Sequence, residues 1–495
     1  MTDSNSNYSD LPPGWKIVQL QDIGKIVSGG TPSTKVAEYW EEEICWISPA
    51  DLSGYNQKYI SKGNKSISKF GLENSSAKLM PKGSILFSSR APIGYVAIAS
   101  NSLATNQGFK SIIPNENIFN EYIYYYLKSA KQLAEKHANG TTFKEISAKA
   151  FASLSIPLPP LPEQHRIVEK IEELFSELDD GVASLKKALE QLKTYRQAVL
   201  KWAFEGKLTE KWRNTHQDSL EDADTLLEQI KAERKRHYQQ QLEDWKQVLK
   251  EWENNGKETK KPTKPQQPKD LPPLTKEELS NLPSLPNGWM WVKVDYLLSL
   301  DKKGMTTGPF GTLLKKSEHQ ISGIPVLGIE NIGNGVFLPK NKIFITEKKA
   351  RELSSFEVSG GDIIISRSGT VGEICLVPAY FGYSLISTNL IRISLNKTII
   401  SPKFFVFLFL GGGSVREQVK ELCKGSTRDF LNQTILQSII FPFPSLQEQT
   451  QIVQEIESRL SVCDQLEATL TENLDKAEAL RQSILKRAFK GKLVL

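Results

Sequence analysis

The sequence predicts an α/β (α+β) protein with two similar domains of mixed, strand-rich structure, separated by two long antiparallel coiled-coil helices and related by a pseudo-two-fold internal repeat. Three observations lead to this prediction. The chain has 495 residues, which is too long for one ordinary core. Its second half repeats its first half. The most strongly repeated segments place apolar residues at alternating steps of three and four, as coiled-coil helices do.

The internal repeat is clearest at the ends of the two halves. Residues 196–208 read RQAVLKWAFEGKL and residues 481–493 read RQSILKRAFKGKL, so nine of thirteen letters agree. Extending this alignment without gaps back to Glu163 and Glu448 gives twenty identities in 46 positions. Each half opens with LPxGW and reaches its EQ pair through a Pro-rich run, IPLPPLPEQ or FPFPSLQEQ. The two halves are therefore diverged copies of one unit.

The repeated segments predict two long spacer helices, over 163–208 and 448–495. A Pro-rich run precedes each start, and Gly206 and Gly491 fit the position just past a helix end. About 43 residues at 1.5 Å each make a rod of roughly 65 Å. Such a rod needs a partner for its narrow apolar stripe, and two like segments paired by a pseudo-two-fold axis run antiparallel. We expect the helices to pair through Ile171, Leu178, Leu185, Leu189, Ile456, Leu460, Leu470 and Leu474.

An alternative arrangement, in which each helix lies on its own globular neighbour, also fits the apolar stripe. The globular regions are predicted over 1–162 and 285–447, where short apolar runs such as SILFSS and LIRISL lie between Gly, Pro and Asn residues. Local helices are expected within 121–136 and 403–422.

An insert over 209–284 has no counterpart after the second helix. Its first part, 220–253, has the composition of a helix, and its second part is a Pro/Lys-rich linker that should be extended. The stretch KAERKRHYQQ within it fits either a basic contact surface or, as alternating charges on a helix more often do, a solvated face.

Composition excludes several classes of protein. No window has the roughly 18 uncharged apolar residues of a membrane span, and the polar N-terminus lacks the pattern of a secretory signal, so a cytoplasmic location is expected. The four cysteines are far apart, which favours buried reduced thiols over metal ligands. The net charge of +6 is concentrated in the globular regions, with +3 in 1–162 and +6 in 285–447. A mild basic excess is weak support for nucleic-acid binding.

These doubled features resemble the specificity subunit of Type I restriction–modification enzymes. The features are the two LPxGW openings, the segments KGSILFSSRAPIG and GGDIIISRSGTVG, the two Pro-rich EQ junctions, and the helices ending AFEGKL and AFKGKL. The resemblance implies two target recognition domains that each read half of a bipartite double-stranded DNA sequence. It also implies docking of two methyltransferase subunits and of restriction subunits. S-adenosylmethionine, ATP and Mg would then belong to these partners, with no cofactor in this chain.

No enzymatic motif appears in the sequence. It has no Asn/Asp-Pro-Pro-Phe/Tyr segment, no phosphate-binding loop of the G-x-x-x-x-G-K-[ST] type and no HExxH. We therefore expect a non-catalytic chain. The alternatives are an orphan DNA-binding chain without partners, a single-chain DNA methyltransferase or nuclease with an unrecognised site, and a coiled-coil spacer with two protein-binding heads.

DNA contacts are expected from polar side chains on loops, because phosphates bind Lys, Arg and hydroxyl groups, and bases bind Arg, Asn and Gln. In the first domain the candidates are Thr31, Ser33, Lys35, Ser89, Arg90, Asn106, Gln107, Thr141, Thr142 and Lys144. In the second domain they are Lys302, Lys303, Thr307, Arg367, Ser368, Asn389, Ser426, Thr427 and Arg428.

Structural roles compete with DNA contact at several of these positions. Asn106 and Asn389 each follow a threonine in matching segments, ATN and STN, and each could equally form a turn. Arg90 and Arg367 fall one position apart in the aligned segments and fit either DNA contact or an ion pair. The tryptophans of the two LPxGW motifs are more typical of core residues. Residues that repeat should build the scaffold, and residues that differ should read DNA.

Overall fold

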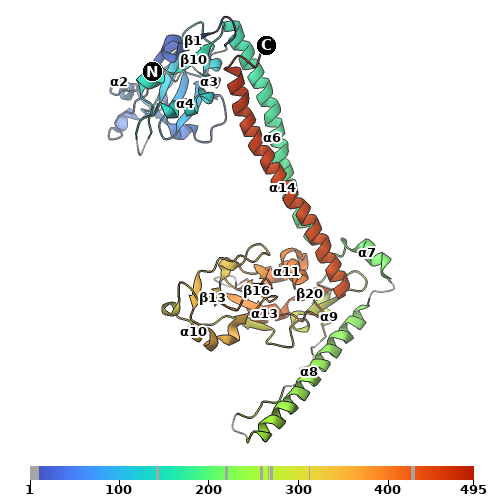
Figure 1. Cartoon of the computed structure of the whole chain (residues 1–495). Coiled ribbons are helices and arrows are strands. Elements are labelled where there is room, and N and C mark those ends of the chain that lie inside the picture. Colours follow the sequence, from blue (N-terminus) through green and yellow to red (C-terminus); the bar gives the residue numbers. More distant parts are fainter. Residues whose placement is uncertain are drawn as a thin grey trace. The chain divides into compact units, whose positions relative to one another are not determined.

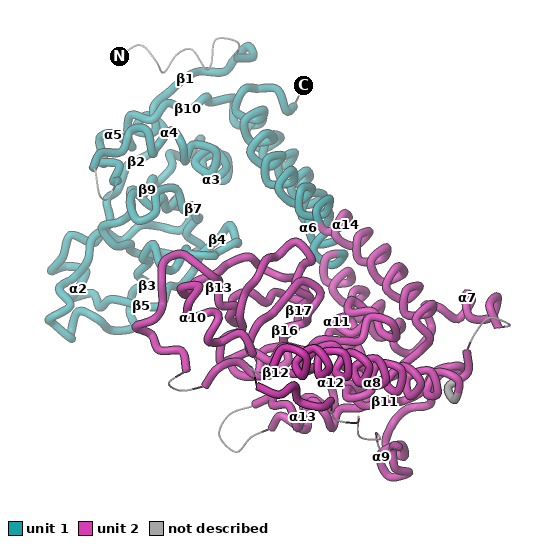
Figure 2. Tube along the Cα trace, turned by 60° about the horizontal axis from the view of Figure 1, so that its bottom comes forward, with its two compact units in different colours: residues 1–188, 468–495 teal, residues 189–467 magenta. Residues whose placement is uncertain are grey.

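The computed structural model of the chain describes residues 11–140, 144–217, 221–256, 260–265, 267, 271, 273–310, 313–424 and 430–494. The chain forms two compact units, coloured separately in Figure 2. Unit 1 contains Met1–Ala188 and Ala468–Leu495, and unit 2 contains Leu189–Glu467. Each unit therefore combines one globular domain with part of each long helix.

Unit 1, whose globular domain lies at the N-terminal end of the colour scale in Figure 1, is built around a five-stranded sheet whose central strand is buried on both faces. The apolar run SILFSS forms its strand β6, in which every residue is buried. The sheet has the order β2-β9-β6-β7-β4 (Gly24–Ser28, Lys110–Pro114, Ile85–Ser89, Ile93–Ala99, Tyr59–Ile60). A three-stranded sheet has the order β5-β3-β8 (Lys65–Ile67, Ile44–Ile47, Ala104–Thr105), and β1 (Lys16–Gln19) pairs antiparallel with β10 (Ser155–Leu158). The short helices are α1 (Leu20–Ile23), α2 (Lys69–Glu73), α3 (Asn120–Ser129), α4 (Lys131–Lys136) and α5 (Ala148–Ala152).

Unit 2 repeats this plan with two four-stranded sheets. The first has the order β12-β19-β16-β17 (Met305–Thr307, Leu390–Ile393, Ile363–Ser366, Ile374–Leu376). The second has the order β14-β13-β18-β15 (Ile343–Ile345, Ile324–Leu327, Ser384–Ile386, Glu357–Val358), and β11 (Met290–Lys293) pairs with β20 (Ile440–Phe443) as β1 pairs with β10. The helices of the second domain are α10 (Glu347–Glu352), α11 (Pro402–Gly411), α12 (Gly413–Leu422) and α13 (Gln433–Ser438). The prediction of two similar mixed α/β domains is confirmed.

The two long helices are α6 (Leu161–Phe204) and α14 (Leu446–Ala488). In unit 1, Asp179 early in α6 pairs with Arg481 late in α14, and the Arg481 guanidinium lies 5.0 Å from the ring of Phe175. In unit 2, Arg196 late in α6 lies 2.6 Å from Asp464 and 2.9 Å from Glu467 of α14. Early residues meet late residues in both units, so the helices run antiparallel in each.

The residues predicted to pair the helices are all at least half-buried, but two of them also belong to the core of a globular domain. Ile171 and Ile456 are fully buried in the apolar cores of unit 1 and unit 2, so the start of each helix packs on its own domain. At these positions the alternative arrangement occurs together with helix pairing. The other six are half-buried: Leu178, Leu185, Leu189, Leu460, Leu470 and Leu474.

The repeated motifs build the same junction in both units. In unit 1 the indole of Trp15 donates to Glu163 at 3.0 Å, and in unit 2 the indole of Trp289 donates to Glu448 at 2.8 Å. The repeated glycine just past each helix end has a left-handed backbone, with φ of 71° at Gly206 and 67° at Gly491. A Cβ at Gly206 would lie 2.3 Å from Pro286, and a Cβ at Gly491 would lie 2.3 Å from Pro12, the prolines of the two LPxGW motifs. Both positions therefore favour glycine.

The ends of the long helices complete the domain cores. Phe489 at the end of α14 lies in the core of unit 1, with its ring 5.3 Å from that of Tyr122. Phe204 at the end of α6 lies in the core of unit 2, with its ring 5.5 Å from that of Phe404. The same helix is thus encoded twice because each copy begins on one domain and supplies core residues to the other domain.

An ionic contact also fastens each domain to the helix that follows it. In unit 1, Lys58 lies between Glu121, at 2.7 Å, and Glu172 of α6, which also accepts a hydrogen bond from Tyr125 at 3.1 Å. In unit 2, Lys403 lies 2.6 Å from Glu457, the residue of α14 that aligns with Glu172. Although burial opposes the shift, hydrogen bonds from Lys58 and a tyrosine lower the pKa of Glu121.

The insert forms a long helix, α8 (Ala223–Asn254), with shorter helices α7 (Glu210–Thr215) and α9 (Lys276–Ser280) on either side of it in the chain. Leu226 and Ile230 of α8 are buried in the core of unit 2, a contact that the sequence did not predict. Within the basic stretch, Arg236 pairs with Glu233 one turn away at 2.7 Å, as on a solvated face. Among the described residues no helix is both long and apolar enough to cross a membrane.

Candidate nucleic-acid interface

Four segments of the first domain meet where strands β2 and β6 end. We call them loop cluster 1: residues 29–36, 88–92, 105–108 and 144–146. Backbone hydrogen bonds join them, from Gly30 N to Thr105 O at 2.8 Å, from Ser89 N to Gly108 O at 2.7 Å and from Ile146 N to Ser89 O at 3.0 Å. Most of the sequence-predicted residues of this domain therefore lie together.

Loop cluster 1 carries several exposed polar side chains. Ser33, Lys35 and Lys144 are exposed, and the hydroxyl of Thr31 donates to the side-chain carbonyl of Gln107. These residues are available to contact a ligand because no core packing holds them.

Other predicted residues of the first domain have structural roles. Ser89 is fully buried and donates its hydroxyl proton to Gly108 O at 3.0 Å, so its side chain cannot reach DNA. The side chain of Asn106 accepts from Gly108 N at 2.7 Å, which is the turn-forming alternative. Arg90 lies 3.5 Å from Glu145, which is the ion-pair alternative.

The second domain has an equivalent set of segments at the ends of β12 and β16. We call it loop cluster 2: residues 307–310, 366–370, 387–389 and 430–433. The backbone N of Arg367 donates to Asn389 O at 3.0 Å, and Leu431 N donates to Arg367 O at 3.0 Å. Ser368 donates to the Asn389 side chain at 2.9 Å, and Gln433 donates to Thr307 at 2.8 Å.

Arg367 is the most unusual residue of loop cluster 2. It is 7% exposed, and its guanidinium lies between two rings, 4.7 Å from that of Phe310 and 4.3 Å from that of Phe430. Its only side-chain hydrogen bond within the described residues goes to Thr388 O at 3.3 Å, and no described carboxylate lies within 4.0 Å. Burial lowers the pKa of this guanidinium. A buried cation without a countercharge retains a demand for an acceptor.

The two rings were missed by sequence reasoning. Phe310 is 53% exposed and Phe430 is 39% exposed, although large aromatic residues usually bury most of their surface. Their only sequence signal is an isolated phenylalanine within the polar and glycine-rich stretches TTGPFG and TRDFLNQ.

Lys302 and Lys303 do not join loop cluster 2. They precede β12, whereas Thr307 ends it. They therefore lie at the opposite end of the strands from Arg367, which follows β16. Lys302 lies 2.8 Å from the buried carboxylate of Asp362 at the start of β16, which gives it a structural partner.

The structural register also corrects the sequence match of the two halves. Asn106 N donates to Ile47 O, and the equivalent donor in the second domain is Ser387 N, to Leu327 O. The match of Asn106 with Asn389 is therefore wrong by two residues. The backbone hydrogen bonds after β8 and β18 make Asn106 equivalent to Ser387. By the same comparison Arg367 corresponds to Ser89 and not to Arg90.

Five predicted residues lie outside the described part of the chain. They are Thr141, Thr142, Ser426, Thr427 and Arg428. The described cysteines, Cys45, Cys375, Cys423 and Cys463, are free thiols. In the described ranges no group of three or more His, Cys, Asp or Glu side chains is placed to hold a metal ion.

The family model of the Type I restriction modification DNA specificity domain matches residues 12–191 and 308–476, together more than half of the chain. The chain belongs to this family. The matched ranges contain both loop clusters except residue 307 of the second, and the whole insert lies between them.

Individual relatives agree with this family. The chain is 40% identical over 189 residues to the Type I restriction enzyme MjaIX specificity subunit of Methanocaldococcus jannaschii, a match that covers 38% of this chain and 43% of that protein. It is 24% identical over 503 residues to the EcoKI specificity subunit of Escherichia coli K12, a match that covers 98% of this chain and 90% of that one. The crystal structure of the HsdS subunit from Thermoanaerobacter tengcongensis covers 99% of this chain with a TM-score of 0.55 at 18% identity, which supports the fold alone.

Proposed function

We propose that this chain is the specificity subunit of a Type I restriction–modification complex and reads a bipartite DNA target, with one loop cluster on each half-site. The observation that carries the proposal is the repeated scaffold with unlike loops. The junction residues are the same in both units, whereas Ser89 in one cluster is replaced by Arg367 in the other. Domains with one fold and different loop chemistry read different sequences.

The chain would do no chemistry itself. Two methyltransferase subunits and, in the restriction complex, restriction subunits would supply the catalysis and bind S-adenosylmethionine, ATP and Mg. The family and the names of the relatives support these partners as a class. Two readers held at a set separation gain affinity when both half-sites fit, so the long helices would make the spacer part of the target.

In the second domain we assign the main reading role to Arg367, together with Ser368 and Asn389 on the adjoining loops. An uncompensated guanidinium can donate two hydrogen bonds to guanine O6 and N7, or to a phosphate. In the first domain we assign contacts to Thr31, Gln107 and the exposed Lys35 and Lys144. The residues outside the described ranges remain candidates from the sequence.

The test is Arg367→Ala in the complex of the chain with its methyltransferase subunits. We expect a loss of about 1–3 kcal/mol in binding, or relaxed specificity, at one half-site only. Arg367→Lys should behave similarly because lysine keeps the charge but loses the planar fork between the two rings. Arg90→Ala is the control, since its ion pair with Glu145 gives it a structural role. Equal losses at both half-sites would contradict the assignment.

A further inference from the structure

A hollow in unit 1 is lined by five lysines. It lies between α3, α4 and the end of α14. Its volume is about 610 Å³, compared with about 360 Å³ for a second hollow of this unit. The lysines are Lys128, Lys131, Lys136, Lys486 and Lys490. No acidic residue lines it. Such a concentration of one sign of charge in a concave surface attracts anions.

These lysines are not neutralised by the protein. Within the described residues none of the five has a carboxylate within 4.0 Å, while the chain's other surface lysines include many that do. Lys128 is the most enclosed: burial, and next the nearby Arg481, lower its pKa, although Glu478 and Asp179 act in the opposite direction. Its ammonium group lies 3.3 Å from the hydroxyl of Tyr124, a neutral partner. A bound anion would relieve this mutual repulsion.

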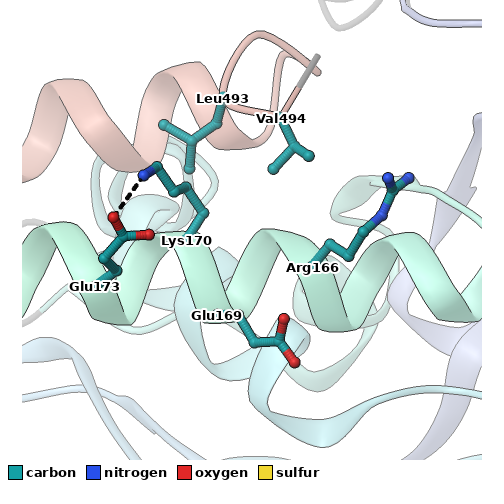
Figure 3. A pocket seen from close by; sticks show the side chains of 6 residues that line it. All are labelled: Arg166, Glu169, Lys170, Glu173, Leu493 and Val494. Carbon is teal, nitrogen blue, oxygen red and sulfur yellow. Dashed lines mark hydrogen bonds and ion pairs between the residues drawn. The ribbon is translucent and has the colours of Figure 1, made fainter.

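The second hollow of unit 1 shows the contrast. Figure 3 shows it between the start of α6 and Leu493, lined by two cations and two acids. Lys170 and Glu173 are paired there at 2.7 Å. A balanced set of charges of this kind gives no preference for an anion.

The internal repeat provides a second contrast. In the gap-free alignment Lys486 corresponds to Lys201, and Lys490 corresponds to Glu205. In unit 2, Lys201 and Glu205 form an ion pair at 3.8 Å. Phe119 and Ser401 are equivalent residues, because the backbone N of each donates to the matching glutamine, Gln164 or Gln449. Counted from these two residues, the position of Lys128 in the first domain is Leu410 in the second. The five-lysine set is therefore a property of the first domain and not of the shared scaffold.

We propose that the five-lysine hollow binds DNA phosphates beside the half-site read by the first domain. The inference rests on the proposed function. Shortly after helix α4, Asn139 forms a β-bridge with Glu145, and Glu145 forms a second β-bridge with Arg90 of loop cluster 1. The hollow is thus continuous in the chain with the loops assigned to DNA. Phosphate contacts by lysine add affinity and carry no sequence information.

The test compares the double variant Lys131→Gln and Lys486→Gln with the control Lys201→Gln, in the full chain assembled with its methyltransferase subunits. The probes are two labelled duplexes, one with the target sequence and one with a scrambled sequence, each titrated over a range of salt concentrations. Each lost phosphate contact should reduce the slope of log affinity against log salt by about 0.9, so the double variant should lose about 1.8. The control should keep the wild-type slope because Lys201 is paired with Glu205.

Four results distinguish the possibilities. A reduced slope with unchanged preference for the target over scrambled DNA supports the inference. An unchanged slope overturns it, and loss of methyltransferase assembly with an unchanged slope would assign the hollow to an acidic protein surface. If the wild-type complex shows no preference for any sequence, the proposed function fails, whatever the slope does. Unchanged thermal unfolding of the variants is required, and is expected because Lys131 and Lys486 are exposed.

Discussion

Glu448 at the start of α14 should be one of the most costly residues to remove, although the aligned Glu163 should not. The Glu448 side chain is 2% exposed and accepts hydrogen bonds from Trp289 at 2.8 Å and from Thr209 at 2.7 Å. It also pairs with Arg213, whose side chain is 11% exposed. Glu448→Ala would leave a buried guanidinium and two buried donors without their acceptor.

The magnitude follows from that burial. Removing one partner of a buried ion pair costs about 3–5 kcal/mol, because the remaining charge is left unpaired. Glu163 is only half-buried, and its side-chain contact within the described residues is the hydrogen bond from Trp15, so Glu163→Ala should cost about 1–2 kcal/mol. The two glutamates of one repeated motif should thus differ by about 1–4 kcal/mol in the cost of their removal.

Hydrogen exchange is the suitable assay, because a chain of several domains has no single free energy of unfolding. In Glu448→Ala the amides that pair β11 with β20 should exchange about 100-fold faster, the equivalent of about 3 kcal/mol. In Glu163→Ala the amides that pair β1 with β10 should exchange no more than about 30-fold faster. Equal acceleration in the two variants would refute the argument from burial.

Two further substitutions test the scaffold. Lys58→Met should destabilise unit 1 by about 1–2 kcal/mol in thermal unfolding, since it leaves the carboxylates of Glu121 and Glu172 facing each other. Adding Glu121→Lys should restore stability, because Lys403 holds the matching position in unit 2 and pairs there with Glu457. Because the pKa of Glu121 is lowered, its contribution should be complete above the ordinary value of 4.5 and lost as the pH falls through the folded value, a loss absent from Lys58→Met. Gly491→Ala should cost at least about 1–2 kcal/mol through its left-handed backbone and its contact with the LPxGW proline, whereas Gly181→Ala within α6, where a Cβ meets nothing within 4 Å, should stabilise the chain by up to about 1 kcal/mol; the reverse order would contradict the junction.

Much of the fold could be predicted because the repeat constrains it. The periodicity of the segments predicted as 163–208 and 448–495 led to α6 and α14, and the Pro-rich runs placed both starts within two residues. The predicted segments extend past the helix ends, by four residues for α6 and by seven for α14. The core contacts of the helix ends were not predictable, since the sequence of Phe204 or Phe489 does not say which domain the side chain enters. Nor was the burial of Leu226 and Ile230, because an amphipathic helix rich in charge can also be fully solvated.

The loop clusters were predicted in part. Polar residues beside repeated strand ends led to Thr31, Gln107, Ser368 and Asn389, and the structure brings these into the two clusters. Ser89 was selected as polar, but a serine hydroxyl is small enough to be buried once a carbonyl accepts its proton. A further limit was register: short segments such as ATN and STN align by letters, whereas strand pairing decides which residues are equivalent.

The most direct measurement is methylation sequencing of DNA from a host that carries this chain with its methyltransferase partners. We expect one split target, two half-sites separated by a fixed number of unspecified base pairs, and Arg367→Ala should alter only one of the halves. A continuous target, or a gap of variable length, would contradict the claim that two unlike loop clusters on a repeated scaffold read the DNA.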